Sequence, residues 1–303
     1  MSDKMGDILN GTRSGEFQAL ARLLTFLEKR GAKELHLVSS LFHSERLAYR
    51  IGITGPPGAG KSTLIGRLIT EFRKLNLKVG VIAVDPSSPL SRGAILGDRL
   101  RYSEHFLDDQ VFIRSLASRG SLGGLSVASY LMAHAFDYAG FDVLLIETVG
   151  VGQTEFEVMN VADFVSVVLV PESGDSIQGM KAGLFEIADL FIVNKSDRPG
   201  AEAFSFELES ALQIGAQTTG KPQVPIELVS AIQGNGLDQM MARFLAAMNT
   251  GDDWKKNRVN RDRLQSEAKA ILRETVEREI QKKTMTIANV GDFLRVIGEN
   301  VSI

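Results

Sequence analysis

The segment at 55–62, with the sequence GPPGAGKS, constrains the fold of this chain more than any other feature. It satisfies the complete phosphate-binding pattern GxxxxGK[ST], and it stands between a strand-like run at 50–54 and a helix-like segment at 62–75. Glycine in such a loop lets successive backbone N–H groups point at phosphate oxygens, and the N-terminus of the helix adds partial positive charge. The pattern and its flanks therefore predict a P-loop that holds the phosphates of a nucleotide.

The lysine and the serine that close this pattern have separate expected roles. Lys61 would reach the β- and γ-phosphates as a point charge, an attraction on the order of 4 kcal/mol before desolvation at about 4 Å and an effective dielectric of about 20. The Ser62 hydroxyl would bind Mg²⁺. The residues expected to contact the nucleotide here are Gly55, Pro56, Pro57, Gly58, Ala59, Gly60, Lys61, Ser62 and Thr63.

Short apolar runs rich in Val and Ile recur along the middle of the chain, separated by amphipathic segments of helix length. The runs lie at 51–54, 79–84, 111–113, 143–146, 165–170, 191–193 and 226–229. Apolar strands that alternate with helices are typical of a mostly parallel sheet covered on both faces. We therefore expect an α/β fold of the P-loop NTPase type, with a mostly parallel central sheet flanked by helices.

Helical patterns flank this α/β region at both ends. Apolar residues recur at helical spacing from Phe17 to Leu27, and Gly31 marks a helix stop. After about residue 251 the composition becomes dense in charge, and 264–280 has helical periodicity. We expect three parts: an N-terminal helical extension at 1–49, a P-loop domain at 50–249 and a C-terminal helical arm at 250–303.

A second motif, NKSD at 194–197, follows a buried-strand pattern and predicts which base is bound. The Asp197 carboxylate can accept both the N1–H and the exocyclic N2–H₂ of guanine, whereas adenine offers no such pair of donors. Leaving a buried polar group unpaired can discriminate by about 10⁴-fold. Asn194 would tie this loop to the P-loop, and the Lys195 stem would pack on the base. Ser230, Ala231 and Ile232, which also end a strand, would add a backbone contact to the guanine oxygen.

Two further strand-like runs end in acidic residues. One run ends in Asp85, and another ends in Glu147, followed by Thr148, Val149 and Gly150. The second is a DxxG-like element with Glu in place of Asp. Its carboxylate could hold Mg²⁺ directly or through water, while the Gly150 N–H donates to the γ-phosphate. Hydrolysis removes that contact, which is how a nucleotide switch works.

Together these motifs resemble, in order and spacing, the MeaB/ArgK-type GTPases. The residues that carry the resemblance are DPSSP at 85–89, ILGD at 95–98, ETVGVGQ at 147–153 and NKSD at 194–197. These proteins belong to the SIMIBI class of P-loop GTPases, and they are accessory G-protein chaperones of adenosylcobalamin-dependent methylmalonyl-CoA mutase. The resemblance implies a homodimer that gates the loading of adenosylcobalamin into that mutase, or a related acyl-CoA mutase, and protects the enzyme.

The resemblance also assigns site residues. It implies that Asp85, Asp98 and Glu147 surround Mg²⁺ and the γ-phosphate as switch residues. It further implies that 173–181 is a third switch, which contacts the mutase and completes the catalytic site, with Lys181 as its candidate charge. Val151 follows Gly150 where a water-orienting Gln would stand, so we expect slow intrinsic hydrolysis that a partner accelerates. The expected catalytic residues are Lys61, Asp85, Asp98, Glu147 and Lys181.

Composition excludes several other functions. The chain has no cysteine, which rules out disulfides, thiol catalysis and Cys-ligated zinc or iron–sulfur sites. Its four histidines are scattered without metal-ligand spacing, and its net charge of -3 gives no bulk attraction to nucleic acid or membrane. The charges at 252–267 are balanced in sign and predict a solvated helix face. With no signal peptide and no long apolar stretch, we expect a cytoplasmic protein.

Two other functions remain open on the residues alone. One is a P-loop kinase that phosphorylates a small molecule or a protein, which would need an acceptor-binding lid and a general base but no NKxD motif. The other is a structural dimer that a nucleotide stabilises without turnover. Preference for ATP over GTP would favour the kinase, and GTP binding without phosphate release would favour the structural dimer.

Overall fold

The computed structural model describes residues 2–29, 32–85, 102–117, 127–148, 154–173, 182–220, 222–250, 253–258 and 261–284. Asp98, Gly150 and Lys181 lie outside these residues, as does the end of the C-terminal arm after residue 284. For Asp85 only the backbone is described. The expected positions of these residues therefore stay predictions.

Seven parallel strands form the central sheet, in the order β3-β2-β4-β1-β5-β6-β7. They are β1 (Tyr49–Thr54), β2 (Val79–Asp85), β3 (Val111–Ala117), β4 (Val143–Glu147), β5 (Phe164–Leu169), β6 (Leu190–Asn194) and β7 (Ile226–Val229). Each lies on an apolar run of the sequence, because strands covered on both faces are apolar at nearly every position. The predicted parallel sheet flanked by helices is confirmed.

Alternate residues of each strand pack against different layers of helices. In β4, Val143 and Leu145 pack in one core with α3 (Lys61–Lys74) and α10 (Leu237–Met248). Leu144 and Ile146 pack in the other core, with α5 (Val127–Tyr138), α6 (Thr154–Val161) and α9 (Ala201–Thr219). All four side chains are fully buried, which is worth about 1.5–3 kcal/mol for each. Two helical layers therefore hold the sheet from opposite faces.

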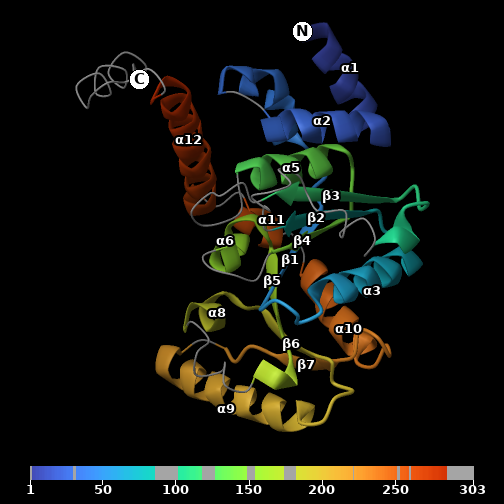
Figure 1. The fold of residues 1–303 in the computed structure, drawn as a ribbon, viewed down its shortest axis with the longest axis vertical. Coiled ribbons are helices and arrows are strands. Elements are labelled where there is room, and N and C mark those ends of the chain that lie inside the picture. The colour runs from blue at the N-terminus through green and yellow to red at the C-terminus, as the bar shows by residue number, and fades with distance from the viewer. Residues whose placement is uncertain are drawn as a thin grey trace.

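The N-terminal helices add a further layer on one side. They are α1 (Ser2–Arg13), α2 (Phe17–Lys29) and the 3₁₀ segment η1 (Ala32–His43). Figure 1 shows α2 above α5, on the side of α5 away from the strands. Leu20, Leu23 and Leu27 recur at helical spacing, so they lie on one face of α2, and all three are buried. The N-terminal helices therefore cover α5, and α2 also contacts strand β3, where Phe17 packs edge-on against Phe112 and Glu28 pairs with Arg114.

The remaining elements are short, apart from one long helix. They are η2 (Ser103–His105), η3 (Pro171–Ser173), α8 (Ala182–Ile187), α11 (Asp253–Arg258) and α12 (Arg261–Thr284). The long helix α12 contacts α5 and α6 and runs away from the sheet toward the C-terminus (Figure 1). No helix in the described part of the chain has both the length and the apolar character needed to cross a membrane.

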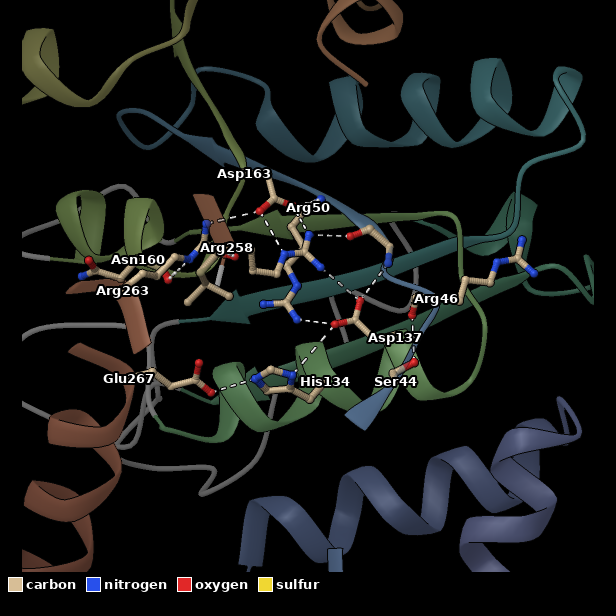
Figure 2. Close-up of polar contacts among 12 residues, drawn as sticks. Ser44, Arg46, Arg50, His134, Asp137, Asn160, Asp163, Arg258, Arg263 and Glu267 are labelled. Carbon is tan, nitrogen blue, oxygen red and sulfur yellow. Dashed lines mark hydrogen bonds and ion pairs between the residues drawn. The ribbon is translucent and has the colours of Figure 1, made fainter. Parts of the chain in front are cut away.

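The charged segment that contains α11 and the start of α12 corrects one prediction. It was expected to be a solvated helix face, but the side chains of Arg258 and Arg263 are only 6% and 17% exposed. Both form ion pairs with Asp163, whose side chain is 1% exposed (Figure 2). The physical reason is that a buried carboxylate requires a paired, hydrogen-bonded counter-charge. Charges that look balanced along the sequence are here balanced across elements.

This buried cluster joins the C-terminal arm to the amino edge of the sheet. Asp137 at the end of α5 pairs through Oδ2 with Arg50 at the start of β1. The guanidinium of Arg258 lies 3.5 Å from Asp137 Oδ1. On α12, Glu267 Oε1 lies 2.8 Å from His134 Nε2 (Figure 2). We call these residues the amino-edge cluster: Arg50, His134, Asp137, Asp163, Arg258, Arg263 and Glu267.

Candidate functional site

The candidate site forms where the carboxyl ends of several strands meet. The P-loop follows β1, Glu147 ends β4, and Asn194 ends β6. Strands β2, β3 and β4 lie on one side of β1, and β5, β6 and β7 lie on the other, so the direction of the connections reverses at β1. Open parallel sheets bind their ligands at such a switch point. The topology therefore brings together motifs that lie far apart in the sequence.

Glycines allow the P-loop to pass close to its neighbours. Gly55 and Gly60 have φ of 135° and 86°, which residues with a side chain rarely adopt. A Cβ on Gly55 would lie 2.1 Å from the Val168 carbonyl oxygen, and one on Gly60 would lie 2.4 Å from Asn194 Nδ2. Gly58 is also left-handed, at 77°. Each of these three positions therefore requires glycine for its backbone conformation, and two require it for space.

The other P-loop residues differ in exposure. Lys61 is 6% exposed, and its Nζ donates to the carbonyl oxygens of Gly55 and Pro56 at 2.7 and 3.0 Å. The lysine ammonium therefore lies over its own loop at the start of α3. Ala59 is buried, Pro56 and Ser62 are half-buried, and Pro57 and Thr63 are exposed.

A carboxylate links the P-loop helix to β4. Glu147 Oε1 accepts a hydrogen bond from Ser62 Oγ at 2.7 Å, and Glu147 Oε2 accepts one from the Tyr102 hydroxyl at 2.7 Å. Tyr102 is fully buried, and Glu147 is 7% exposed. The backbone of Asp85 lies at the same edge, two residues beyond Ala83, which pairs with Glu147. A serine hydroxyl and a carboxylate thus lie side by side next to the P-loop.

This pair of oxygen ligands fits Mg²⁺. Mg²⁺ is commonly bound by one or two carboxylates together with phosphate oxygens and water, and not by a cage of protein ligands. Among the described residues there is no group of three or more His, Cys, Asp or Glu side chains that could hold a metal ion. The Ser62 hydroxyl and the Glu147 carboxylate are oxygen ligands of the kind such a site takes from the protein, and phosphate oxygens and water would supply the others.

Asn194 connects the NKSD loop to two other loops. Its side chain is 3% exposed; Nδ2 donates to the Ala59 carbonyl oxygen at 2.8 Å, and Oδ1 accepts from the Ala231 N–H at 3.1 Å. Lys195 has φ of 58°, and its Nζ donates to the Gly58 carbonyl oxygen at 2.7 Å. One asparagine and one lysine therefore fix the NKSD loop against the P-loop.

The acidic residue of the NKSD loop, Asp197, is exposed and ionised. Asp197 Oδ1 accepts a hydrogen bond from Ser230 Oγ. This hydrogen bond, with the charges of Arg198 and Lys195, outweighs burial and holds the pKa of Asp197 below its ordinary value. At neutral pH its carboxylate is thus an acceptor with no proton to donate, which suits two N–H donors on one edge of a base.

These contacts match the family assignment that the motifs predicted. The model of a family described as Methylmalonyl Co-A mutase-associated GTPase MeaB matches residues 20–286. The chain belongs to the MeaB family of GTPases. The match covers most of the described structure, from within α2 to the end of α12. The predicted class of enzyme, a GTP hydrolase, is confirmed for the family to which the chain belongs.

Individual proteins are similar to this chain in sequence or in structure. A relative in Pyrococcus horikoshii is 41% identical over 294 residues, which are 96% of this chain and 91% of that protein. One in Pyrococcus abyssi is 49% identical over 208 residues, which are 69% of this chain and 64% of that protein. A crystal structure described as that of a LAO/AO transport system kinase has a TM-score of 0.67 and 27% identity, covering 99% of this chain and 93% of that chain.

Sequence reasoning missed three residues at this MeaB-family site. Tyr102 holds Glu147, and Thr148 Oγ1 donates to Thr54 Oγ1 at 2.8 Å, joining β4 to β1. Arg67 on α3 donates to the carbonyl oxygens of Ala231 and Ile232. Tyr102 and Arg67 belong to no recognised motif, Thr148 lies within ETVGVGQ without an assigned role, and the partners of all three are more than 40 residues away along the chain. Only the fold identifies them.

Proposed function

We propose that this MeaB-family GTPase is a switch that acts on an adenosylcobalamin-dependent acyl-CoA mutase, with methylmalonyl-CoA mutase as the first candidate. Its GTP hydrolysis would gate the loading of adenosylcobalamin into the mutase and protect that enzyme. The family match over residues 20–286 carries this proposal, because the family is described by its association with methylmalonyl-CoA mutase. The geometry of the carboxyl edge supports the nucleotide-binding part of it.

The guanine nucleotide would bind along the carboxyl edge of the sheet. The backbone of the P-loop and Lys61 would hold the phosphates, with a further N–H from Gly150 to the γ-phosphate. Asp197 would accept from the guanine N1–H and N2–H₂, Lys195 would pack on the base, and the turn at 230–232 would contact the guanine oxygen. Catalysis would be positional and electrostatic, since the transition state of phosphoryl transfer spreads its charge over oxygens.

Mg²⁺ would be held at this edge by oxygen ligands. Ser62 and Glu147 lie next to each other, and Asp85 and Asp98 are the further proposed ligands. When bound, the ion neutralises charge on the β- and γ-phosphates. Tyr102 positions the Glu147 carboxylate by donating to the oxygen that does not face Ser62.

A partner would complete the catalytic site. We propose that Lys181 supplies charge to the transferring phosphoryl group when the mutase binds at 173–181. Charges supplied in this way accelerate other GTPases by about 10³–10⁵-fold. Intrinsic hydrolysis would accordingly be slow.

The proposed organisation follows the three parts of the sequence. The GTPase domain would span 50–249, with a helical extension at 1–49 and a C-terminal arm at 250–303 that pairs two subunits into a homodimer. The partners would be the mutase and a second subunit, without nucleic acid or membrane, in the cytoplasm.

Co-purification tests the partner. We expect the chain to be retained by immobilised methylmalonyl-CoA mutase, and the retained amount to change between GDP and a non-hydrolysable GTP analogue. Lys181→Ala should reduce mutase-stimulated phosphate release by at least about tenfold, whereas Lys256→Ala, at a side chain that is 75% exposed, should leave stimulation intact. No retention with either nucleotide would refute the mutase as partner, and full stimulation of Lys181→Ala would refute the role of that lysine.

A kinase is the second candidate, because the crystal structure of similar fold is described as that of a transport system kinase. The two functions differ in where the γ-phosphate goes. With γ-labelled GTP and ATP in separate reactions, a GTPase releases labelled inorganic phosphate from GTP. Label that is transferred from ATP to a small molecule or protein would favour the kinase.

A further inference from the structure

We infer that Arg67 is a positioning residue for guanine recognition, which acts by orienting the backbone N–H that reads the guanine O6. The inference rests on the proposed binding of a guanine nucleotide. Arg67 lies on α3, the helix that starts at the P-loop, whereas the backbone it contacts lies in the turn after β7. The residue therefore connects the helix at the phosphates with the loop at the base.

The guanidinium of Arg67 holds two consecutive carbonyl groups. Its Nε donates to the Ala231 oxygen at 2.8 Å, and its terminal NH2 nitrogen donates to the Ile232 oxygen at 3.0 Å. The planar fork of arginine suits two acceptors that lie side by side, and a lysine ammonium does not reproduce that geometry. The two contacts together fix two successive peptide planes.

Fixing these carbonyls also fixes the N–H groups of the same peptides. In a planar trans peptide the C=O and the N–H point in opposite directions, and the described backbone contains no cis peptide bond. The Ala231 carbonyl points at Arg67, so the N–H of Ile232 points away from it. In the same way the N–H of Gln233 is turned inward, where it donates to Ser230 Oγ at 3.2 Å.

The hydroxyl of Ser230 brings this turn to the residue that reads the base. Ser230 Oγ donates to Asp197, the proposed acceptor for the guanine N1–H and N2–H₂. O6 lies next to N1 on the guanine ring and is an acceptor, so it requires a donor beside that carboxylate. The Ala231 N–H already donates to Asn194 Oδ1, which leaves the N–H of Ile232 as the donor that Arg67 orients.

The test compares diphosphates that differ from GDP at one position. In 6-thio-GDP a sulfur replaces O6 and accepts hydrogen bonds more weakly, while N1–H and N2–H₂ remain. In IDP the N2 amino group is absent and O6 remains. We expect wild type to prefer GDP over 6-thio-GDP by about tenfold, the worth of one well-made hydrogen bond. In Arg67→Met that preference should fall below about threefold, while the preference for GDP over IDP stays unchanged.

Two matched variants control the comparison. Arg73→Met removes another arginine of α3, one that donates to the Leu77 carbonyl oxygen and to Asp108 and lies outside the base loop. It should retain both preferences. Arg67→Lys should recover only part of the O6 preference. In GTP hydrolysis measured over a range of GTP concentrations, Arg67→Met should raise KM and leave kcat within about twofold, since the phosphate contacts are intact.

If Arg67→Met keeps the full preference for GDP over 6-thio-GDP, the role of Arg67 is refuted, whatever its effect on stability. If wild type does not prefer GDP over ADP, the proposed guanine site itself is wrong. A change in thermal midpoint with unchanged base preferences would mean that Arg67 only stabilises the fold, which also overturns the inference.

Discussion

Asn194 and Asp197 divide the work of the NKSD motif at the scale of single residues. Asn194 is buried and connects the P-loop to the turn after β7 through both atoms of its amide. Asp197 is exposed, and a single hydroxyl, that of Ser230, holds its carboxylate in orientation. The first residue therefore assembles the site, and the second remains accessible to a ligand.

Asp197→Asn should change which base is preferred. An amide in this position loses one acceptor and gains a donor, which repels the N1–H of guanine and suits the additional oxygen of xanthine. We expect GDP affinity to fall by at least about 100-fold and XDP affinity to rise, as measured by competition against a fluorescent nucleotide. Wild type measured with the same nucleotides is the control. Unchanged GDP affinity would show that Asp197 does not read the base.

The sequence motifs predicted the contacts of Asn194 but not those of Tyr102 or Arg67. The NKxD pattern has a fixed chemical task, so its residue types disclose the role. A tyrosine that orients a carboxylate, or an arginine that holds a backbone turn, depends on partners that the chain brings near only on folding. Single residues of this kind carry no local pattern.

At the scale of elements, the amino-edge cluster explains how the C-terminal arm is attached. Asp163 lies between α6 and β5, and it is faced by Arg258 of α11, Arg263 of α12 and the N–H of Arg50. The single tryptophan, Trp254, packs edge-on against Tyr49 with ring centroids 5.2 Å apart. Charge and aromatic contacts thus hold α11 and α12 against the amino edge of the sheet.

Asp163→Asn should destabilise the protein strongly. The change removes the carboxylate that pairs with Arg263 and the nearer of the two that face Arg258, and breaking such a buried ion pair costs about 3–5 kcal/mol in free energy of unfolding. Urea denaturation followed by Trp254 fluorescence measures it. Asp253→Asn is the matched control, because the Asp253–Lys256 pair is about three-quarters exposed and is worth about 0–1 kcal/mol. Equal stability of the two variants would contradict the structural role of the cluster.

The environment of Glu267 predicts that the free energy of unfolding depends on pH. Burial raises the pKa of Glu267, but the hydrogen bond and charge of His134, with the charges of Arg50 and Arg263, outweigh burial and hold that pKa below its ordinary value of 4.5. The unfolded chain therefore binds the proton more readily. The contribution of Glu267 to stability is fully present above pH 4.5 and is lost as the pH falls through the folded-state pKa.

Glu267→Gln isolates this contribution. The difference in free energy of unfolding between wild type and variant should shrink as the pH falls below the ordinary glutamate value. Urea titrations at a series of pH values measure it, and the subtraction removes carboxylates common to both proteins. A difference that grows toward acid pH would mean that the sign of the pKa shift is wrong.

The elements themselves were largely predictable, and the exception has a physical cause. Strands buried on both faces appear as unbroken apolar runs, so all seven positions could be read from the chain. In the charged segment of α11 and α12, the prediction of a solvated face is wrong for Arg258 and Arg263, whereas Lys256 and Asp253 are exposed. Charge pattern along one segment cannot distinguish a solvated face from a buried one, because the carboxylates that pair with it belong to α5 and to the chain before β5.

At the scale of the whole molecule, the two ends of one sheet serve different purposes. The carboxyl edge gathers the P-loop, Glu147 and the NKSD loop, and the amino edge holds the C-terminal arm. The central strand β1 belongs to both, since Arg50 at its start lies in the amino-edge cluster and Thr54 at its end leads into the P-loop. The surface of the nucleotide site is therefore separate from the attachment of the arm.

The rate of phosphate release from GTP, with and without methylmalonyl-CoA mutase, tests the central claim most directly. We expect slow release from the chain alone, acceleration of at least about tenfold by stoichiometric mutase, and no release from ATP under either condition. Heat-denatured mutase is the control. A rate that the mutase leaves unchanged, or release from ATP as fast as from GTP, would contradict a guanine-nucleotide switch that serves this enzyme.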